Sequence, residues 1–253
     1  MNRILLNIDI GERGPYHAGD RALIPYADII NVACGGHAGS AESVDIFRTM
    51  ADERNIMVMA HVSYPDKPNF GRATVRIPFP QLRASLDAQL AMLPGVKAVK
   101  CHGALYNDCC SDAKLARNVG EWLANAEVSC VTTLKGSELD KECQHLGIKV
   151  FSEAFAERRY AYSQSTQQLS LINRKKPKAC ITDLGEALEN VRTMVCCRQV
   201  KAFIANSTRQ PEVQMVDLDA DTICIHSDSP IALELAEGVA KLLKKESCTC
   251  RPE

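Results

Sequence analysis

The chain alternates short apolar runs with longer amphipathic stretches over nearly its whole length. The apolar runs lie at 4–10, 29–34, 56–62, 96–101, 128–133, 149–155, 178–182, 200–204 and 222–227. Most of them are almost continuously apolar, which is typical of strands buried on both faces of a parallel sheet. Helical patterns occur at 41–54, 79–92, 112–125, 137–145, 183–197 and 229–245. Repeated strand–helix units predict an α/β fold, either a parallel barrel or a doubly wound sheet.

No linker and no short-period repeat interrupts this alternation, so we expect one domain over 1–245. The segment 160–178 is polar and ends in a basic run at Arg174–Lys178. It is interpreted as a solvated loop rather than a binding patch. The tail, 246–253, is predicted to be disordered.

Charge and cysteine usage exclude several classes of protein. The chain has 30 Lys and Arg against 31 Asp and Glu, which gives no support for a nucleic-acid partner or an anionic membrane surface. No apolar run is long enough to cross a bilayer, and the N-terminus is interpreted as a first strand, not a signal peptide. The 12 cysteines contain no Cys-x-x-Cys pair. Free thiols in a cytoplasmic protein are the preferred interpretation.

Four of the six histidines follow predicted strands, namely His37, His61, His102 and His226. Since the carboxyl ends of parallel strands share one edge of the fold, we expect these four side chains to line one cavity. Other polar side chains at these strand ends are Asn7, Asp9, Glu12, Lys100, Glu153 and Arg158. Carboxylates, imidazoles and two cations suit general acid–base work on a carbonyl or amide.

Motifs for other site types are missing. The chain has no Walker A sequence, no GxGxxG fingerprint, no G-x-S-x-G elbow and no H-E-x-x-H. Asp9, His61 and His102 are acceptable ligands for a divalent ion, because separate strand ends can converge on one metal. The sequence leaves open whether a metal is bound.

Several segments resemble, in order, the motifs of the LamB/YcsF family, which includes the A subunit of an ATP-dependent 5-oxoprolinase. They are LLNIDIGE (5–12), NVACGGHAGS (31–40), AHVSYPD (60–66), FGRA (70–73), VKCHGALYN (99–107), GSEL (136–139), EAFAERRY (153–160) and HSDSP (226–230). The resemblance covers nearly the whole chain. It implies a distorted, seven-stranded β/α barrel of the glycoside hydrolase/deacetylase type.

The same resemblance implies a function, ATP-dependent opening of the lactam 5-oxoproline to glutamate together with oxoprolinase B and C subunits. The implied catalytic residues are Asp9, Glu12, His61, Lys100 and His102. The implied substrate-binding residues are Asn7, Asn31, His37, Tyr106, Asn107, Glu153, Arg158 and His226. Phosphorylation of the lactam oxygen by ATP would make the ring carbon open to attack by water. Replacement of Asp9 by Asn or of Lys100 by Ala is expected to abolish activity and leave the fold intact.

The chain departs from the family pattern at three positions that bear on the site. Leu5 replaces an aspartate, so a carboxylate is expected to be missing at the first strand end. Gly36 replaces a phenylalanine, which is expected to change the pocket volume. Ser40 replaces an aspartate, and as a helix cap it is expected to lack a capping box because Ser43 is short. Two alternatives therefore stay open, a metal-dependent deacetylase or amidohydrolase on a related barrel, and a divergent binding protein that is not an oxoprolinase.

Overall fold

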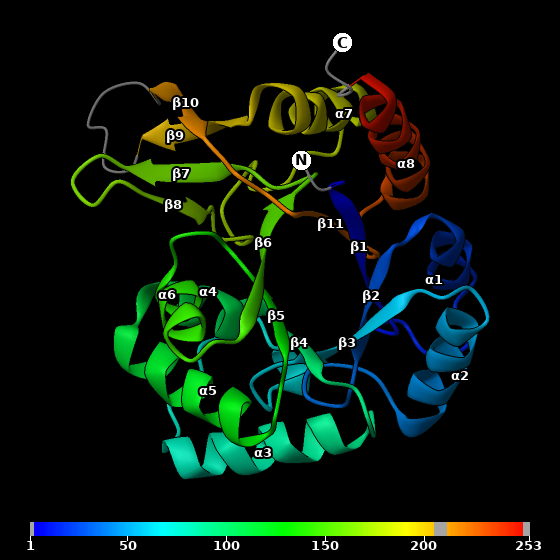
Figure 1. The fold of residues 1–253 in the computed structure, drawn as a ribbon, viewed down its shortest axis with the longest axis vertical. Coiled ribbons are helices and arrows are strands. Elements are labelled where there is room, and N and C mark those ends of the chain that lie inside the picture. Colours follow the sequence, from blue (N-terminus) through cyan, green and yellow to red (C-terminus); the bar gives the residue numbers. More distant parts are fainter. Residues whose placement is uncertain (1–2, 205–211, 250–253) are drawn as a thin grey trace.

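Seven parallel strands close into a barrel in the computed structural model, which describes residues 3–204 and 212–249 (Figure 1). The strands are β1 (Leu5–Ile10), β2 (Ile29–Ala33), β3 (Met57–Val62), β4 (Ala98–Cys101), β5 (Cys130–Thr133), β6 (Lys149–Phe155) and β11 (Thr222–His226). They neighbour one another in the order β1-β11-β6-β5-β4-β3-β2, and every adjacent pair is parallel. The predicted seven-stranded parallel barrel is confirmed.

Helices surround the barrel, as Figure 1 shows for α2, α3 and α5. They are α1 (Ala18–Leu23), α2 (Ala41–Asp52), α3 (Phe79–Ala91), α4 (Gly103–Ser111), α5 (Ala113–Asn125), α6 (Glu138–His145), α7 (Leu184–Arg192) and α8 (Ala232–Thr249). The helical pattern did not predict α1 or α4.

Helix α8 extends into the predicted tail, whose residues 250–253 lie outside the described part. No helix in the described part is long and apolar enough to span a membrane. The single domain over 1–245 stays a prediction.

Helix α2 begins with a complete capping box, contrary to the expectation for Ser43. The backbone N–H of Ser43 donates to Ser40 Oγ at 3.1 Å, and the backbone N–H of Ser40 donates to Ser43 Oγ at 2.8 Å. The short serine side chain suffices because its hydroxyl lies close enough to the Ser40 backbone to accept that hydrogen bond. This cap fixes the helix directly after the loop that carries His37.

The barrel interior is apolar at its amino end and polar at its carboxyl end. Successive strand residues point to opposite faces, so in β1 Leu6 and Ile8 pack outward in the main core while Asn7 and Asp9 point inward. An apolar layer closes the amino end of the interior; it consists of Leu5, Ile29, Met57, Met59, Ala98, Cys130 and Phe151. A polar site can therefore form only above this layer.

Leu5 lies in that apolar layer and not beside the site. It is the first residue of β1, four residues before Asp9, and four strand residues span roughly 13 Å. The expectation that Leu5 leaves a gap among the site carboxylates is therefore wrong. The motif aligns Leu5 with an aspartate, but the direction of the strand puts this position at the opposite end of the barrel from the histidines.

A second, four-stranded sheet follows β6, in the order β10-β9-β7-β8. Its strands are β7 (Tyr160–Ser163), β8 (Gln168–Leu171), β9 (Gln199–Ile204) and β10 (Val213–Asp217). The predicted solvated loop at 160–178 thus contains a β-hairpin, β7–β8. The run at 178–182 forms only an isolated bridge from Cys180 to Arg158, and the strand predicted at 200–204 belongs to this sheet instead of the barrel. The residues of β8 alternate between exposed and partly buried, so they form no continuous apolar run, and the sequence pattern did not predict a strand there.

Several cysteines are free thiols that pack in the main apolar core. Cys34, Cys101, Cys109, Cys143 and Cys224 are buried free thiols. Burial raises the pKa of Cys34 to about 12, so this thiol stays protonated at neutral pH.

We expect Leu5→Asp to lower the free energy of unfolding by at least about 2 kcal/mol, because a carboxylate enters an apolar layer that offers it no partner. Leu5→Met, which conserves volume, should cost less than about 1.5 kcal/mol. Urea unfolding followed by circular dichroism measures both. An aspartate variant as stable as the parent protein would contradict the position of Leu5 in the apolar layer.

Candidate active site

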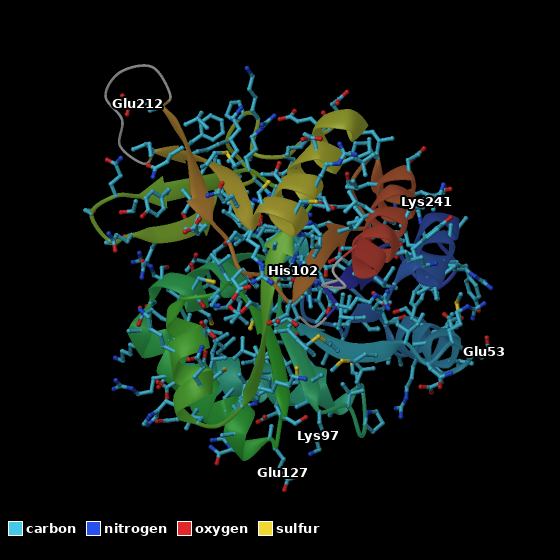
Figure 2. The ribbon with its side chains drawn as sticks, turned by 45° about the horizontal axis from the view of Figure 1, so that its top comes forward. Glu53, Lys97, His102, Glu127, Glu212 and Lys241 are labelled. Carbon is cyan, nitrogen blue, oxygen red and sulfur yellow. The ribbon has the colours of Figure 1, made fainter. Side chains whose placement is uncertain are left out.

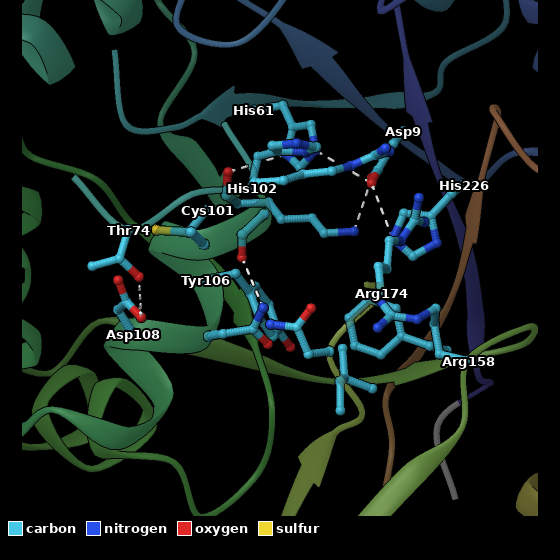
Figure 3. Close-up of a pocket in the computed structure, with 18 of the residues that line it drawn as sticks. Asp9, His61, Thr74, Cys101, His102, Tyr106, Asp108, Arg158, Arg174 and His226 are labelled. Atoms are coloured by element: carbon cyan, nitrogen blue, oxygen red, sulfur yellow. Dashed lines mark hydrogen bonds and ion pairs between the residues drawn. The ribbon is translucent and has the colours of Figure 1, made fainter. Parts of the chain in front are cut away.

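A cavity of about 410 Å³ opens at the carboxyl end of the barrel (Figure 3). Eight of the side chains predicted from the sequence line it: Asp9, His61, Lys100, His102, Tyr106, Asn107, Arg158 and His226. They come from β1, β3, β4, β11, helix α4 and the segments directly after β4 and β6, so residues far apart in sequence converge on one space. Figure 2 shows His102, one of these residues, in the middle of the ribbon. Figure 3 shows Asp9, His61 and His226 at one end of the cavity and Arg158 and Arg174 on the side away from His61.

The floor of the cavity is built around the ammonium group of Lys100, which is 2% exposed. Lys100 Nζ lies 2.8 Å from Asp9 Oδ1 and 2.8 Å from Glu153 Oε1. It also lies 3.0 Å from Cys224 Sγ. A buried ammonium is tolerated only with such partners, because the loss of hydration must be offset by charge and hydrogen bonds.

The pair formed by Lys100 and Asp9 stays ionised. Burial alone would lower the pKa of Lys100, but Asp9, Cys224 and Glu153 outweigh it and raise the pKa well above its ordinary value. Burial would also raise the pKa of Asp9, but His61 and Lys100 outweigh that effect and hold the pKa well below its ordinary value. At neutral pH the floor therefore presents a carboxylate whose charge is fixed.

Two asparagines position this carboxylate from below. The amide of Asn31 donates to Asp9 Oδ1 and to Asn7 Oδ1, each at 2.8 Å, and Asn7 donates to Thr222 Oγ1 at 3.0 Å. Neither asparagine lines the cavity. Asn31 thus contacts Asp9, Asn7 contacts Asn31 and Thr222, and a contact of either asparagine with substrate stays a prediction. Glu153 likewise lies under the cavity, where it pairs with Lys100.

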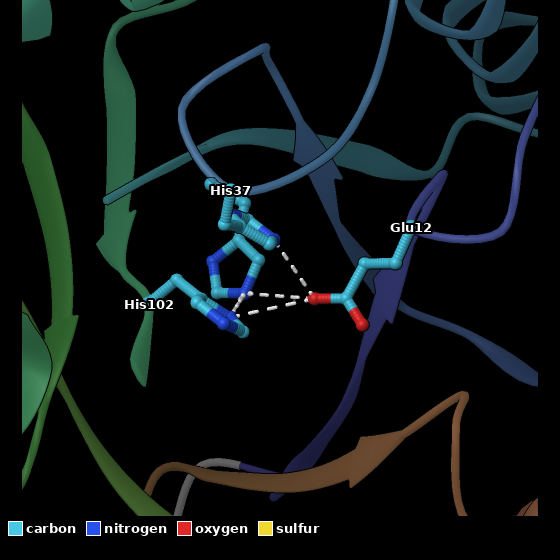
Figure 4. A group of neighbouring side chains, drawn as sticks. Glu12, His37 and His102 are labelled. Carbon is cyan, nitrogen blue, oxygen red and sulfur yellow. Dashed lines mark hydrogen bonds and ion pairs between the residues drawn. The ribbon is translucent and has the colours of Figure 1, made fainter. Parts of the chain in front are cut away.

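A second cluster joins Glu12 to three imidazoles (Figure 4). Glu12 Oε1 lies 3.0 Å from His37 Nε2, 3.4 Å from His102 Nδ1 and 3.8 Å from His61 Nε2. His61 Nε2 and His102 Nδ1 are 3.0 Å apart, and Asp9 Oδ2 lies 3.2 Å from His61 Nε2. Of the four histidines expected to line one cavity, His61, His102 and His226 line it, whereas His37 joins the cluster with Glu12 but is not among the lining residues.

The glycine-rich loop explains how His37 reaches this cluster. Gly35 and Gly39 have φ of +96° and +89°, and a Cβ on Gly39 would overlap the carbonyl of Ala33. The backbone N–H of Gly35 donates to Ala38 O at 2.7 Å, which closes the turn. Only glycine fits such a close backbone approach, and the resulting turn carries the His37 ring inward.

Two imidazoles of this cluster, His37 and His102, have a lowered pKa and are therefore neutral at neutral pH. Burial lowers the pKa of His37 despite its contact with Glu12, which acts in the opposite direction. Burial, together with the neighbouring His37 and His61, lowers the pKa of His102 well below its ordinary value. Neutral imidazoles offer lone pairs to a proton, a substrate or a metal.

His226 stands apart from that cluster and is held by Glu157, a residue that sequence reasoning missed. The ring Nδ1 and the backbone N–H of His226 both contact Glu157 Oε1. Its Nε2 lies 3.8 Å from Asp9 Oδ2. Glu157 follows β6 in the EAFAERRY motif, where no local pattern distinguishes it from the charged residues beside it.

The cavity wall opposite the histidines is cationic. Arg158 is buried, and its Nη2 donates to the carbonyl of Ile172 at 2.6 Å. Arg72 and Arg174 both pair with Asp228. Arg174 belongs to the segment predicted to be solvated, so that prediction is wrong for this residue, because the β7–β8 hairpin brings it back over the barrel.

Arg158 lacks such a partner. Within the described ranges, no carboxylate lies within ion-pair distance of it, and its Nε makes no hydrogen bond. Burial and the neighbouring Arg174 lower the pKa of Arg158, and the second cause is repulsion between two cations. This wall can therefore accept an anionic group.

Comparison with known proteins places the chain in a family. The model of the LamB/YcsF family matches residues 4–253. The chain belongs to this family. A relative from Paracidovorax citrulli (strain AAC00-1), named as the A subunit of 5-oxoprolinase, is 35% identical over 98% of both chains. A relative of the same name from Pyrococcus abyssi is 34% identical, over 99% of this chain and 97% of its own.

A solved structure shares the fold. The crystal structure of the lactam utilization protein from Thermus thermophilus matches with a TM-score of 0.79 and 30% sequence identity. The match covers 97% of this chain and 98% of that chain. It agrees with the seven-stranded parallel barrel described above and supports the resemblance inferred from the motifs.

Gly36 does not enlarge the cavity, although the LamB/YcsF pattern places phenylalanine there. A Cβ at Gly36 would overlap Gln89 Oε1 and Ser63 Oγ. Gln89 fills this space and is itself fixed, since it accepts from Ser63 N at 2.8 Å and donates to Ser63 O at 2.9 Å. The expected change in pocket volume is therefore not found, because a side chain from α3 occupies the space.

We expect Lys100→Ala to lower the free energy of unfolding by about 3–5 kcal/mol, since Asp9 and Glu153 would be left as uncompensated buried carboxylates. This replaces the sequence-based expectation of an intact fold. Lys135→Ala is the matched control; Lys135 pairs with Asp219 at the surface, and its loss should cost no more than about 1 kcal/mol. Urea unfolding compares the two. Equal stability of both variants would show that the buried ammonium does not support the barrel.

Proposed function

We propose that this chain is the lactam-opening component of an ATP-coupled 5-oxoprolinase, which converts 5-oxoproline to glutamate together with B and C subunits. The names of the relatives, which describe each as an A subunit, support an assembly of several different chains. The observation that carries the proposal is the cavity itself, which joins an ionised carboxylate at its floor to a buried arginine at its wall that has no anionic partner among the described residues.

The cavity suits a small cyclic amide that bears a carboxylate. A volume of about 410 Å³ is at the lower end of ordinary small-molecule sites. The carboxylate of 5-oxoproline would bind Arg158 and relieve its repulsion with Arg174. Tyr106 and Asn107 of helix α4 line the same cavity and offer polar groups to the ring amide.

The weak basicity of Asp9 supports coupling to ATP. A carboxylate whose pKa is held low is a poor base toward water, so it suits an activated carbonyl better than an unactivated lactam. Transfer of a phosphoryl group to the lactam oxygen supplies that activation. Water then adds to the ring carbon, the ring C–N bond breaks to leave an acyl phosphate, and a second water releases phosphate and glutamate.

Two groups are placed to move protons in this sequence. Asp9 accepts a proton from the attacking water. His226, whose Nδ1 is held by Glu157, presents Nε2 on the side of Asp9 and can donate a proton to the departing ring nitrogen. Glu157 thus positions His226 in the way that a carboxylate orients a catalytic histidine.

A metal-dependent amidohydrolase is the second candidate, and the cluster of Glu12 with three imidazoles favours it. The two candidates differ in their energy source. Glutamate release that needs ATP and the B and C subunits supports the first candidate. Amide hydrolysis by the isolated chain without ATP supports the second.

We expect Arg158→Gln to raise the KM for 5-oxoproline about 10-fold to 100-fold, since a charged hydrogen bond is worth about 1.5–3 kcal/mol. Arg159→Gln is the control, because Arg159 pairs with Glu186 outside the cavity and its loss should leave KM unchanged. The assay is ATP-dependent glutamate release with B and C subunits added. An unchanged KM in the Arg158 variant, with a normal melting temperature, would remove Arg158 from substrate binding.

A further inference from the structure

Backbone carbonyls fix the hydrogen atoms on two imidazoles of the Glu12 cluster. His61 Nδ1 lies 3.2 Å from Lys100 O, and His102 Nε2 lies 3.0 Å from Phe70 O. A carbonyl oxygen only accepts, so both of these nitrogens carry hydrogen. The remaining nitrogens, His61 Nε2 and His102 Nδ1, face each other at 3.0 Å, and each is an acceptor unless its ring takes up a second proton.

A third acceptor completes the group. Glu12 Oε1 lies 3.4 Å from His102 Nδ1 and 3.8 Å from His61 Nε2, and the Glu12 side chain is only 2% exposed. In the described part of the chain, the ion-pair partners of Glu12 are imidazoles, and no lysine or arginine is among them. A proton added to His61 Nε2 could be shared with His102 Nδ1 at 3.0 Å or with Asp9 Oδ2 at 3.2 Å but not with Glu12 Oε1 at 3.8 Å, whereas a metal ion can bind Glu12, His61 and His102 together.

We propose that Glu12, His61 and His102 bind one divalent transition metal of the zinc class beside the cavity. A tetrahedral zinc ion with bonds of about 2.0–2.2 Å separates its ligand atoms by about 3.3–3.6 Å. The three separations here, 3.0, 3.4 and 3.8 Å, bracket that spacing. The N–H groups donated to Lys100 O and Phe70 O are the outer hydrogen bonds that hold metal-binding imidazoles in place.

His37 positions the carboxylate and is not itself a ligand. Its ring stacks on His102 with centroids 3.6 Å apart and an angle of 2° between the planes. A metal bound in the plane of the His102 ring cannot also lie in the parallel plane of His37. His37 Nε2 instead lies 3.0 Å from Glu12 Oε1, where its N–H can fix the carboxylate.

A rival group of possible ligands, Asp9, Cys224 and His226, already holds a cation. Lys100 Nζ lies 2.8 Å from Asp9 Oδ1 and 3.0 Å from Cys224 Sγ. A divalent ion there would have to displace or repel the ammonium group. The Glu12 cluster contains no such cation, which favours it as the metal site.

The inference extends beyond the lactam reaction and does not depend on it. His61 and His102 line the cavity while Glu12 stands behind them, so the bound ion would be within reach of a ligand in the cavity. With two histidines and one carboxylate, the ion keeps open positions, as in catalytic rather than structural zinc sites.

Zinc titration of the full chain tests the site, using protein without a histidine tag that has been stripped of metal with a chelator. Calorimetry and elemental analysis should give one zinc per chain. Glu12→Gln should weaken zinc binding at least about 100-fold, and His37→Asn should weaken it about 10-fold to 100-fold as a positioning residue. Cys224→Ser and His145→Asn, which alter the rival group and a histidine in α6, should bind zinc as the parent protein does.

Cobalt gives a readout that needs no variant. The cobalt-loaded parent protein should show visible d–d bands without a thiolate charge-transfer band. If the parent protein does not bind stoichiometric zinc, the proposal is overturned. A proton shared between His61 and His102 would then explain the short contact between their rings. Zinc binding that survives in Glu12→Gln but is lost in Cys224→Ser, or a thiolate band with cobalt, would also overturn it. None of these results depends on glutamate release, so the proposed function is tested separately.

Discussion

The ammonium group of Lys100 inside the barrel is the interaction on which the site depends. It joins Asp9 of β1 to Glu153 of β6, so three strands are tied together at the level where the interior changes from apolar to polar. A buried lysine without both carboxylates would lose more in hydration than it gains. The same contact that stabilises the barrel also keeps Asp9 ionised, and structure and chemistry therefore cannot be varied independently at this position.

Asp9 connects this structural charge to the reactive side chains. Its Oδ1 accepts from Lys100 and Asn31, which leaves Oδ2 to face His61 at 3.2 Å and His226 at 3.8 Å. One carboxylate thus links the barrel interior, the cluster of imidazoles around Glu12, and the His226–Glu157 pair. The layered interior, with an apolar layer at the amino end, confines these groups to the end where the cavity opens.

The four-stranded sheet and the segments next to it bring further charged side chains to the cavity. Its β7–β8 hairpin brings Arg174 over the cavity, and the segment between β6 and β7 carries Glu157 and Arg158. The imidazoles and Asp9 consequently lie on the barrel side of the cavity, and Arg158 and Arg174 lie on the side of the sheet. A substrate with an anionic group at one end and an amide at the other fits this division.

The sequence by itself determined a parallel α/β fold and the residues that its strands carry to one end, whereas the closed seven-stranded barrel was implied by the resemblance to the LamB/YcsF family. Apolar runs of strand length and the polar residues after them suffice for the first, because in a parallel sheet the chain direction alone decides which end a residue occupies. Only the tertiary structure decided which residues touch. It put Leu5 at the far end, filled the space beside Gly36 with Gln89, folded 160–171 into a hairpin, and paired Glu157 with His226. These outcomes depend on contacts between segments distant in sequence, which local patterns do not encode.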